Sequence, residues 1–560
     1  MQVKGAYSAD FETTTDPDDC RVWAWGLCDI ETEECYTGNN IQSFMRFCST
    51  KGVVVAWFHN LAFDGKFIVD FLLRCEYEHV TDGRPYRGQF STLVSVKGMF
   101  YQIDVCFGNG ARVSFRDSMK LFPMSIKTLA KAYDMPYSKG EIDYEAPRPV
   151  GHELTDEETD YLLRDIKIAR FALKHNYDNG LTRITAGSNA FADFKTRFGK
   201  KHFKKMFPIQ PDEVDLYCRE GYRGGFTYCN PKYQEKVTGQ GISVDYNSMY
   251  PSQMLSQPFP VGNPVMFDGQ YEYDEHFPLY FQTLTCDFAV KQNHVPMVQL
   301  NSPGIYGLHK YVEYTEEPAT LTLTSVDLAL FFECYDVDVY SWDGGYKFRQ
   351  QYNLFTEYIN YWGEVKRNSQ GGLRQIAKLM LNSLYGKFAT NRNVTQKVPV
   401  MEDNVVKWKD GELELRDSIY VPVACFATAY ARDALIRAIL ANYDRFIYCD
   451  TDSMHLIGTQ DPVGIRLHDS DFCAWKVEGT FDRSKHLRAK SYVLDYGGDL
   501  TISCAGMSDT VKQLVTFDNF EFGFSNLDSN GNVIPGAGKL LPKAVPGGVV
   551  LKESPYILKR

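Results

Sequence analysis

Short apolar segments alternate with amphipathic ones over roughly the first 185 residues of the chain. Apolar runs of strand length predict β-strands at Ala6–Phe11, Val22–Asp29 and Val53–Phe58. Thr155 followed by Glu158 forms a capping-box pattern, which predicts a helix over the residues that follow. Strands that alternate with helices are typical of an α/β domain.

The remaining residues show a different succession of patterns. A strand is predicted at 239–245 and a helix from Arg374 to Phe388. Two apolar segments around an Asp-Thr-Asp turn predict a hairpin over 445–458. Residues 257–354 are rich in proline and aromatic residues, and the C-terminal part is rich in glycine and proline. At roughly 100–200 residues per domain, the chain is expected to form about three to five domains.

The composition is that of an ordinary globular protein with ample core, since 44% of the residues are apolar and 23% are charged. No apolar run approaches the ~18–20 residues of a membrane span, and the start lacks the apolar stretch of a signal peptide. We therefore expect a cytoplasmic protein. The 14 cysteines contain no Cys-x-x-Cys pair, so we expect reduced, mostly buried thiols and no metal finger.

The net charge of −11 argues mildly against a nucleic-acid partner, because phosphates attract basic surfaces. Net charge is an average, however, and two basic runs at 200–205 and 485–490 could line a channel. Each run taken alone is more typical of a solvated face. The aromatic content of 14% suits base stacking and core packing equally well.

Carboxylates recur at distinctive positions in the N-terminal part. Asp10 and Glu12 point to the same side of a strand, and buried charges need compensation by a metal ion or an arginine. Asp64 follows an apolar strand, and Tyr161 and Asp165 share one helix face. The helical pair taken alone could instead be a hydrogen-bonded core pair.

A second set of carboxylates lies in the C-terminal half. Asp245 ends an apolar strand, while Asp450 and Asp452 lie in a hairpin turn where a metal ion can reach them. The alternative is a polar hairpin tip, since aspartate is common in turns.

One helix carries a polar face that matches this second set. Within about an 80° arc the helix presents Arg374, Lys378, Asn382 and Tyr385. Two cations, an amide and a tyrosine suit a nucleoside triphosphate. A solvated basic face is the alternative, but the segment is otherwise too apolar for a surface helix.

The ordered set Asp-x-Glu, Asn-x-x-x-Asp and Tyr-x-x-x-Asp resembles the exonuclease motifs of proofreading DNA polymerases. The resemblance implies a pair of Mg²⁺ ions and a tyrosine, Tyr161, that orients the attacking water. The implied metal ligands are Asp10, Glu12, Asp64 and Asp165. The implied contacts to a single-stranded 3′ end are Thr13, His59, Asn60, Phe63, Phe67, Ser118 and Met119, with Met119 standing where leucine is usual. Lys139 is implied to assist catalysis.

Three further segments, 245–251, 378–387 and 448–453, resemble the polymerase motifs of family B DNA polymerases. Tyr222-Arg223-Gly224-Gly225 and Lys490-Ser491-Tyr492 resemble two shorter elements of that family. The resemblance runs the length of the chain and is nearest to the protein-primed members from small Bacillus phages. A departure is Tyr246, where a smaller aliphatic residue is usual.

This resemblance implies an α/β multidomain fold with an RNase H-like 3′–5′ exonuclease domain and a right-hand polymerase of palm, fingers and thumb. The expected boundaries are 1–185 for the exonuclease domain, 186–256 and 417–504 for the palm, 257–354 and 391–416 for terminal-protein regions 1 and 2, 355–390 for the fingers, and 505–560 for the thumb.

The resemblance also implies template-directed DNA synthesis from a protein primer, with proofreading, strand displacement and processivity. Two Mg²⁺ ions per active site, replaceable by Mn²⁺, are expected at the polymerase carboxylates. The expected polymerase metal residues are Asp245, Val244, Asp450 and Asp452. The expected nucleotide contacts are Tyr250, Lys366, Arg374, Lys378, Asn382 and Tyr385, with Tyr250 excluding a 2′-hydroxyl. The expected DNA contacts are Tyr222, Arg223, Gly224, Gly225, Lys387, Lys490 and Tyr492.

The expected partners are a DNA template and primer, dNTPs and a terminal protein that forms a heterodimer with a monomeric polymerase in the cytoplasm of a bacterial host. The alternatives are a DNA-primed family B repair polymerase, a nuclease with a degenerate polymerase half, a non-catalytic DNA-binding scaffold and a reverse transcriptase. The intact carboxylate sets argue against the degenerate enzyme and the scaffold, and the N-terminal Asp-x-Glu domain argues against the reverse transcriptase.

Overall fold

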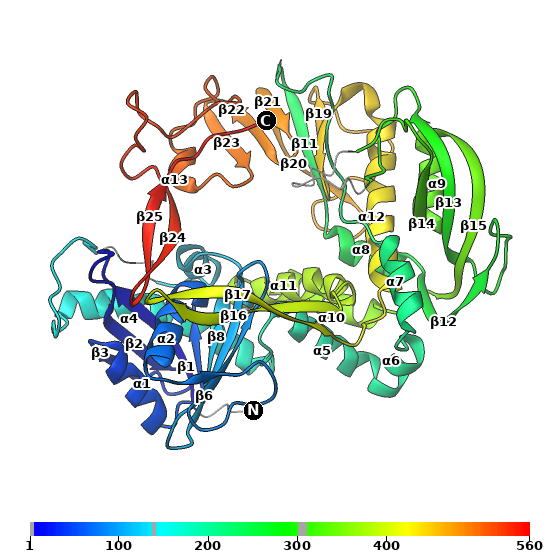
Figure 1. Cartoon of the computed structure of the whole chain (residues 1–560). Helices are drawn as coiled ribbons and strands as arrows, with labels where there is room; N and C mark the ends of the chain where they lie inside the picture. Colours follow the sequence, from blue (N-terminus) through cyan, green and yellow to red (C-terminus); the bar gives the residue numbers. More distant parts are fainter. Residues whose placement is uncertain (1–4, 137–139, 141, 301–310) are drawn as a thin grey trace.

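A computed structural model describes residues 5–136, 140, 142–300 and 311–560 of the chain (Figure 1). The N-terminal part is built on an eight-stranded sheet with strand order β3-β2-β1-β4-β8-β7-β6-β5. Its strands are β1 (Ala6–Thr13), β2 (Val22–Asp29), β3 (Cys35–Gly38), β4 (Val55–Phe58), β5 (Glu78–His79), β6 (Gln89–Val94), β7 (Phe100–Cys106) and β8 (Arg112–Asp117). Its helices are α1 (Ile41–Thr50), α2 (Leu61–Arg74), α3 (Ile126–Ala132) and α4 (Asp156–Asp178). The three predicted strands correspond to β1, β2 and β4, and the predicted capping box begins α4.

The two faces of β1 are covered by different layers. Phe11 belongs to the hydrophobic core formed with α1 and α2, whereas Asp10 and Glu12 alternate to the other face. Helix α4 packs closely there because β2 carries Gly26, where a β-carbon would lie 2.4 Å from the Cδ1 atom of Ile166. This glycine therefore lets α4 bring its polar residues close to the carboxylates of β1.

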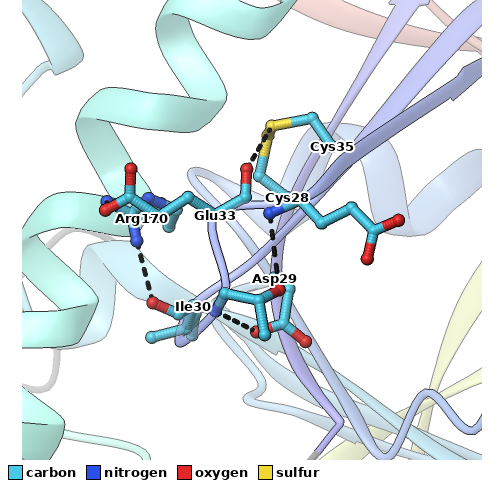
Figure 2. Close-up of a disulfide and its surroundings, with 8 residues drawn as sticks. Cys28, Asp29, Ile30, Glu33, Cys35 and Arg170 are labelled. Carbon is cyan, nitrogen blue, oxygen red and sulfur yellow. Dashed lines mark hydrogen bonds and ion pairs between the residues drawn. A yellow bond between two sulfur atoms is a disulfide. The ribbon is translucent and has the colours of Figure 1, made fainter.

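Cys28 and Cys35 form a disulfide across β2 and β3, which corrects the expectation that all thiols are reduced (Figure 2). The register of the two antiparallel strands places the cysteines opposite each other, with their Cα atoms 4.1 Å apart. A search for Cys-x-x-Cys spacing misses such a pair, because the pairing depends on strand register. Arg170 of α4 braces the loop between them, donating 2.8 Å to the Ile30 carbonyl and 2.6 Å to Glu33.

Two further sheets form the centre of the C-terminal half. The larger has the order β20-β11-β19-β18-β9, and the smaller has the order β10-β21-β22-β23. Their strands are β9 (Thr227–Cys229), β10 (Val237–Thr238), β11 (Gly241–Tyr246), β18 (Phe446–Asp450), β19 (Ser453–Ile457), β20 (Trp475–Phe481), β21 (Arg483–Arg488), β22 (Ser491–Tyr496) and β23 (Asp499–Cys504). The flanking helices are α8 (Met249–Ser256) and α12 (Pro422–Ala441). The predicted hairpin is present as β18 and β19.

The segment predicted as the first insert forms its own sheet, with order β12-β15-β13-β14. It contains β12 (Phe259–Phe267), β13 (Leu279–Val290), β14 (Ala319–Thr324), β15 (Tyr335–Gln351) and α9 (Ser325–Cys334). The helices beside it are α5 (Ala186–Phe198), α6 (Lys200–Met206), α7 (Asp212–Glu220), α10 (Thr356–Asn368) and α11 (Gly371–Phe388). Helix α11 corresponds to the predicted helix, and the domain boundaries themselves stay predictions.

Two long hairpins reach back to the N-terminal part (Figure 1). They are β16 (Asn393–Glu402) with β17 (Val405–Leu415), and β24 (Lys539–Val545) with β25 (Gly548–Ser554). Trp408 packs on Phe100 with ring centroids 5.0 Å apart, and Arg74 of α2 donates 2.6 Å to Asn404. Gly548 packs against Phe67, where a β-carbon would lie 2.5 Å from the ring. Both hairpins therefore dock on α2 and connect the C-terminal half of the chain to the N-terminal part. Within the described ranges, no helix has the length and apolar character needed to span a membrane.

Candidate functional site

The C-terminal carboxylates meet at one end of the central sheet. Asp245 lies in β11 opposite Ser453 of β19, so the turn that holds Asp452 lies directly beside it. The Tyr246 amide donates 2.6 Å to the Asp452 carbonyl and fixes this turn. Burial and the nearby Asp452 charge raise the pKa of Asp245 to about 7. Burial and the charge of Asp450 raise the pKa of Asp452 to about 6.

Asp450 has protein partners of its own. Lys490 places its Nζ atom 2.8 Å from each carboxylate oxygen, and Thr227 donates a further hydrogen bond of 2.8 Å. Asp450 is thus compensated by a lysine, whereas Asp245 and Asp452 repel each other. Val244 is fully buried inside the sheet, so only its main-chain carbonyl could contribute an oxygen ligand, and its role at the metal site stays a prediction.

The carboxylate oxygens of Asp245 and Asp452 are suitable ligands for Mg²⁺. Among the described residues, no three His, Cys, Asp or Glu side chains converge as a ready-made metal site. Mg²⁺ is commonly held by one or two carboxylates together with substrate phosphates and water. Two oxygen-donor side chains with raised pKa values match that requirement, because a divalent cation would relieve their repulsion.

A group of cations faces the carboxylates. Lys366 of α10 donates 3.0 Å to the Ser248 hydroxyl, and Arg374 donates 2.8 Å to the Lys366 carbonyl. Burial, Arg374 and Lys378 lower the pKa of Lys366, so the three positive charges repel one another. Among the described residues none of the three forms a close ion pair, and Lys366 and Lys378 interact with the charge of Asp245 over a longer distance. The arrangement is suited to an anion such as a triphosphate.

The predicted face of α11 is present. Arg374, Lys378 and Asn382 are exposed positions of this otherwise largely buried helix. Tyr385 stacks on Tyr250 of α8, with ring centroids 3.8 Å apart and planes 17° apart. Tyr250, predicted to select the sugar, therefore stacks on the helix that presents the cations.

The loop with Tyr222 is tied to the same turn. A β-carbon on Gly225 would lie 2.8 Å from Thr451, so only glycine permits this approach. Arg432 of α12 donates to the carbonyls of Arg223 and Gly224 at 2.6 and 2.7 Å. The sequence analysis missed Arg432, because a buried arginine inside an apolar helix has no motif of its own.

Three N-terminal carboxylates lie close enough for their charges to interact, although they do not meet in the arrangement of a ready-made metal site. Burial, followed by the charges of Asp10 and Glu12, raises the pKa of Asp64 well above its usual value. Burial and the charge of Glu12 raise the pKa of Tyr161, which also shares a 2.6 Å hydrogen bond with Tyr144. One oxygen of Asp64, Oδ1, is buried with no hydrogen-bond partner among the described residues. Such an atom fits a metal ligand.

The predicted contacts to a DNA end divide into two groups. His59 lies 2.9 Å from the Ser118 hydroxyl, and Asp117 accepts from the amides of Asn60 and Met119 at 3.1 and 3.0 Å. These residues therefore form one cluster beside the carboxylates. Thr13 ends β1 next to Glu12.

Phe63 packs on Phe67 with ring centroids 5.6 Å apart. Phe67 is buried beneath Gly548 and is covered in this conformation. Lys139 lies outside the described residues.

A basic hollow of about 610 Å³ lies between the N-terminal part and α5. Its cationic lining consists of Arg116, Arg183, Lys195, Lys200 and Lys387. Burial and the charges of Lys204 and Lys200 lower the pKa of Lys195, as expected where cations gather without acids. Sequence analysis found only Lys387 and the basic run that begins at Lys200. The others come from distant segments and form no pattern along the chain.

Comparison with known proteins decides the family. The family described as DNA polymerase type B, organellar and viral, matches residues 48–150 and 147–468. The chain belongs to this family. It is 41% identical to the DNA polymerase of Bacillus phage Nf and 40% identical to that of Bacillus phage phi29, over 99% of each chain. The solved ternary complex of phi29 DNA polymerase with primer-template DNA and incoming nucleotides matches with a TM-score of 0.92 and 40% identity, covering 99% of this chain and 100% of that one.

These findings confirm the predicted family, fold class and DNA-directed DNA polymerase activity. At the level of the family, they also confirm a protein-primed replicative polymerase with a 3′–5′ exonuclease. The match spans both halves of the type B polymerase, so the lone nuclease, the scaffold and the reverse transcriptase are not supported. A dependence on divalent metal ions goes with the family.

Proposed function

We propose that this chain copies DNA at the Asp245 and Asp452 pair and trims it at the Asp10, Glu12, Asp64 and Asp165 cluster. The observation that carries the proposal is the pairing of two repelling carboxylates with a facing group of cations that have no ion-pair partner among the described residues. Such a pair holds Mg²⁺ or Mn²⁺, and the cations bind the triphosphate.

Asp245 and Asp452 would hold the metal ions of the polymerase site. Metal ions held there would lower the pKa of the primer hydroxyl and neutralise charge on the phosphates. Lys366, Arg374 and Lys378 orient the triphosphate. Asn382 and Tyr385 complete this face of α11, with Tyr385 toward the base.

Metal binding has a readout that does not depend on activity. The pKa of Asp245 in the folded chain, about 7, exceeds its usual 3.8, so the free energy of unfolding falls as the pH rises from about 4 to about 7. This penalty is absent below pH ~4 and complete above pH ~8. In EDTA, Asp245→Asn is therefore expected to melt at a higher temperature than the unmodified protein at pH 8, with the difference vanishing near pH 4. Added Mg²⁺ should stabilise the unmodified protein more than the variant, because both keep the second proposed metal site but only the unmodified protein keeps Asp245. Equal Mg²⁺ stabilisation of both would contradict the assignment.

Tyr250 is proposed to exclude ribonucleotides. Its ring is held flat against Tyr385, on the helix that presents the cations, and a 2′-hydroxyl of a bound ribonucleotide would collide with it there. Tyr250→Val is expected to raise ribonucleotide incorporation by ~10²-fold or more, because the steric barrier is removed while the phosphate contacts remain. Single-nucleotide insertion with dNTP and NTP measures the ratio. Tyr271→Val is the matched control, since Tyr271 also lies in a stacked pair, with Tyr280 at 3.8 Å, but in the insert. An unchanged ratio in the Tyr250 variant would remove its role.

At the second site, Asp10, Glu12, Asp64 and Asp165 would hold metal ions that activate water for phosphodiester hydrolysis. Tyr161 orients that water, and Lys139 assists. The single-stranded end is bound by Thr13, His59, Asn60, Phe63, Ser118 and Met119. Phe67 joins this group only when the β24–β25 hairpin moves off it.

We assign the DNA path as follows. Lys490 and Tyr492 hold the primer terminus, and the loop from Tyr222 to Gly225 contacts the template-primer. Lys387 and the basic hollow bind phosphates of the template strand, because a cluster of cations without acids attracts a polyanion. The docked hairpins enclose the DNA, which accounts for processivity and strand displacement.

For initiation, the attacking hydroxyl belongs to a terminal protein rather than to a DNA end. The insert sheet β12–β15 is proposed to dock that protein, which forms a heterodimer with a monomeric polymerase in the cytoplasm of a bacterial host. Incubation of the chain with purified terminal protein, dATP and template tests this proposal. Nucleotide covalently linked to protein is expected. Extension of DNA primers alone would favour the DNA-primed alternative.

A further inference from the structure

Two histidines that the reaction does not use are buried between the central sheet and the smaller sheet. His455 lies in β19 and His486 in β21, and both are almost fully buried. Their rings are joined by a hydrogen bond of 3.0 Å from Nδ1 of His455 to Nε2 of His486. The bond therefore links the sheet that carries the catalytic turn to the sheet whose next turn carries Lys490.

The histidine pair has a further contact on the side of His486 that faces away from His455. The other ring nitrogen of His486 lies 3.4 Å from the Ser484 hydroxyl, which lies 2.6 Å from that of Thr238. Burial lowers the pKa of both rings, that of His455 to about 4, so both are neutral near pH 7. One ring must then donate and the other accept, and this makes the contact directional.

Tyr448 connects the pair to the site. Its ring lies against both histidines, with centroids 5.4 and 5.2 Å away, and its hydroxyl accepts the Lys490 amide at 2.9 Å. That amide belongs to a residue in the left-handed region, with φ 57°, whose Nζ atom binds Asp450. Tyr492 packs on both rings as well, at 5.0 and 5.3 Å.

We propose that the hydrogen-bonded pair His455–His486 is a positioning device that sets the primer-holding residues Lys490 and Tyr492 against the catalytic turn. The inference rests on the proposed polymerase function and adds two residues to it. Neither histidine touches the substrates. Loss of the bond lets the smaller sheet shift relative to Asp450. This shift weakens binding of the primer end by Lys490 and Tyr492 but leaves the Asp245–Asp452 pair in place.

The test uses two substitutions of one histidine in the full chain. His486→Phe keeps a ring but removes the hydrogen bond, whereas His486→Gln keeps a polar nitrogen or oxygen near the position of Nε2. For His486→Phe the KM for primer-template is expected to rise about tenfold, the usual scale for leaving a buried partner unsatisfied. The kcat and the KM for dNTP should stay unchanged. His486→Gln is expected to restore most of the primer affinity.

Degradation of single-stranded DNA by the same preparations reports whether the N-terminal part is folded, and an unchanged kcat reports the same for the polymerase half. His79→Phe is the matched control, because His79 is half-buried and likewise bonded, 2.9 Å from Thr92, but lies in the N-terminal sheet. The proposal is overturned if His486→Phe leaves the primer KM unchanged, if His486→Gln is equally impaired, or if single-strand degradation falls in parallel. Failure of the unmodified chain to extend primers would instead overturn the proposed function.

Discussion

Asp452→Ala is expected to lower primer extension by at least ~10³-fold while single-stranded DNA is degraded at the normal rate. Asp452 lies beside Asp245, and removal of one carboxylate from a two-member metal site leaves no adequate ligand set. The carboxylates of β1, α2 and α4 belong to the N-terminal part, which is built on a different sheet. None of them belongs to the Asp245 and Asp452 pair. Gel assays of extension and of degradation, run on one preparation, measure both rates.

Asp444→Ala is the matched control for this change. Asp444 is an exposed aspartate just before the same hairpin, so its loss changes the net charge equally without altering the site. Both rates should be unaffected. If Asp452→Ala lost both activities, the assignment of two independent sites would be wrong.

The double substitution of Asp10→Ala and Glu12→Ala is expected to give the reverse outcome. Degradation should fall by at least ~10³-fold, because two of four proposed ligands are removed, and primer extension should be retained. The removal of two repelling charges also lowers the pKa of Asp64, so the variant should fold at least as stably as the unmodified chain. Melting curves in EDTA at pH 8 check this second expectation.

Asp16→Ala with Asp18→Ala is the corresponding control, since both aspartates are exposed in the loop that follows β1. Retained degradation in the Asp10 and Glu12 variant would show that other residues hold the metal. A parallel loss of extension would show that the two halves of the chain are not independent.

The sequence was most informative where chemistry and local periodicity coincide. The alternation of β1 places Asp10 and Glu12 on one face, and the Thr155 capping box begins α4 as predicted. Asp245 and Asp452 could each be singled out in advance, because Asp245 ends an apolar strand and Asp452 lies in the turn between two others. Such features depend on neighbours along the chain.

Features that depend on tertiary register were not predictable. The Cys28–Cys35 pair needs the β2–β3 register, and the His455–His486 contact needs two sheets to pack. The basic hollow gathers cations from segments up to 271 residues apart, from Arg116 to Lys387. Arg432 is hidden in an apolar helix and is recognisable only through the carbonyls that it contacts.

The Cys28–Cys35 bond closes a loop with a sequence separation of only seven residues, so the entropic gain from cross-linking the unfolded chain is modest, roughly 2–3 kcal/mol. Arg170 holds the same loop through Ile30 and Glu33 without any sulfur. Because Arg170 holds the loop as well as the disulfide, we expect the loop to keep its conformation under both oxidising and reducing conditions. The trimming half of the enzyme should therefore keep its shape both in a glutathione-rich cell interior and in an aerated reaction tube.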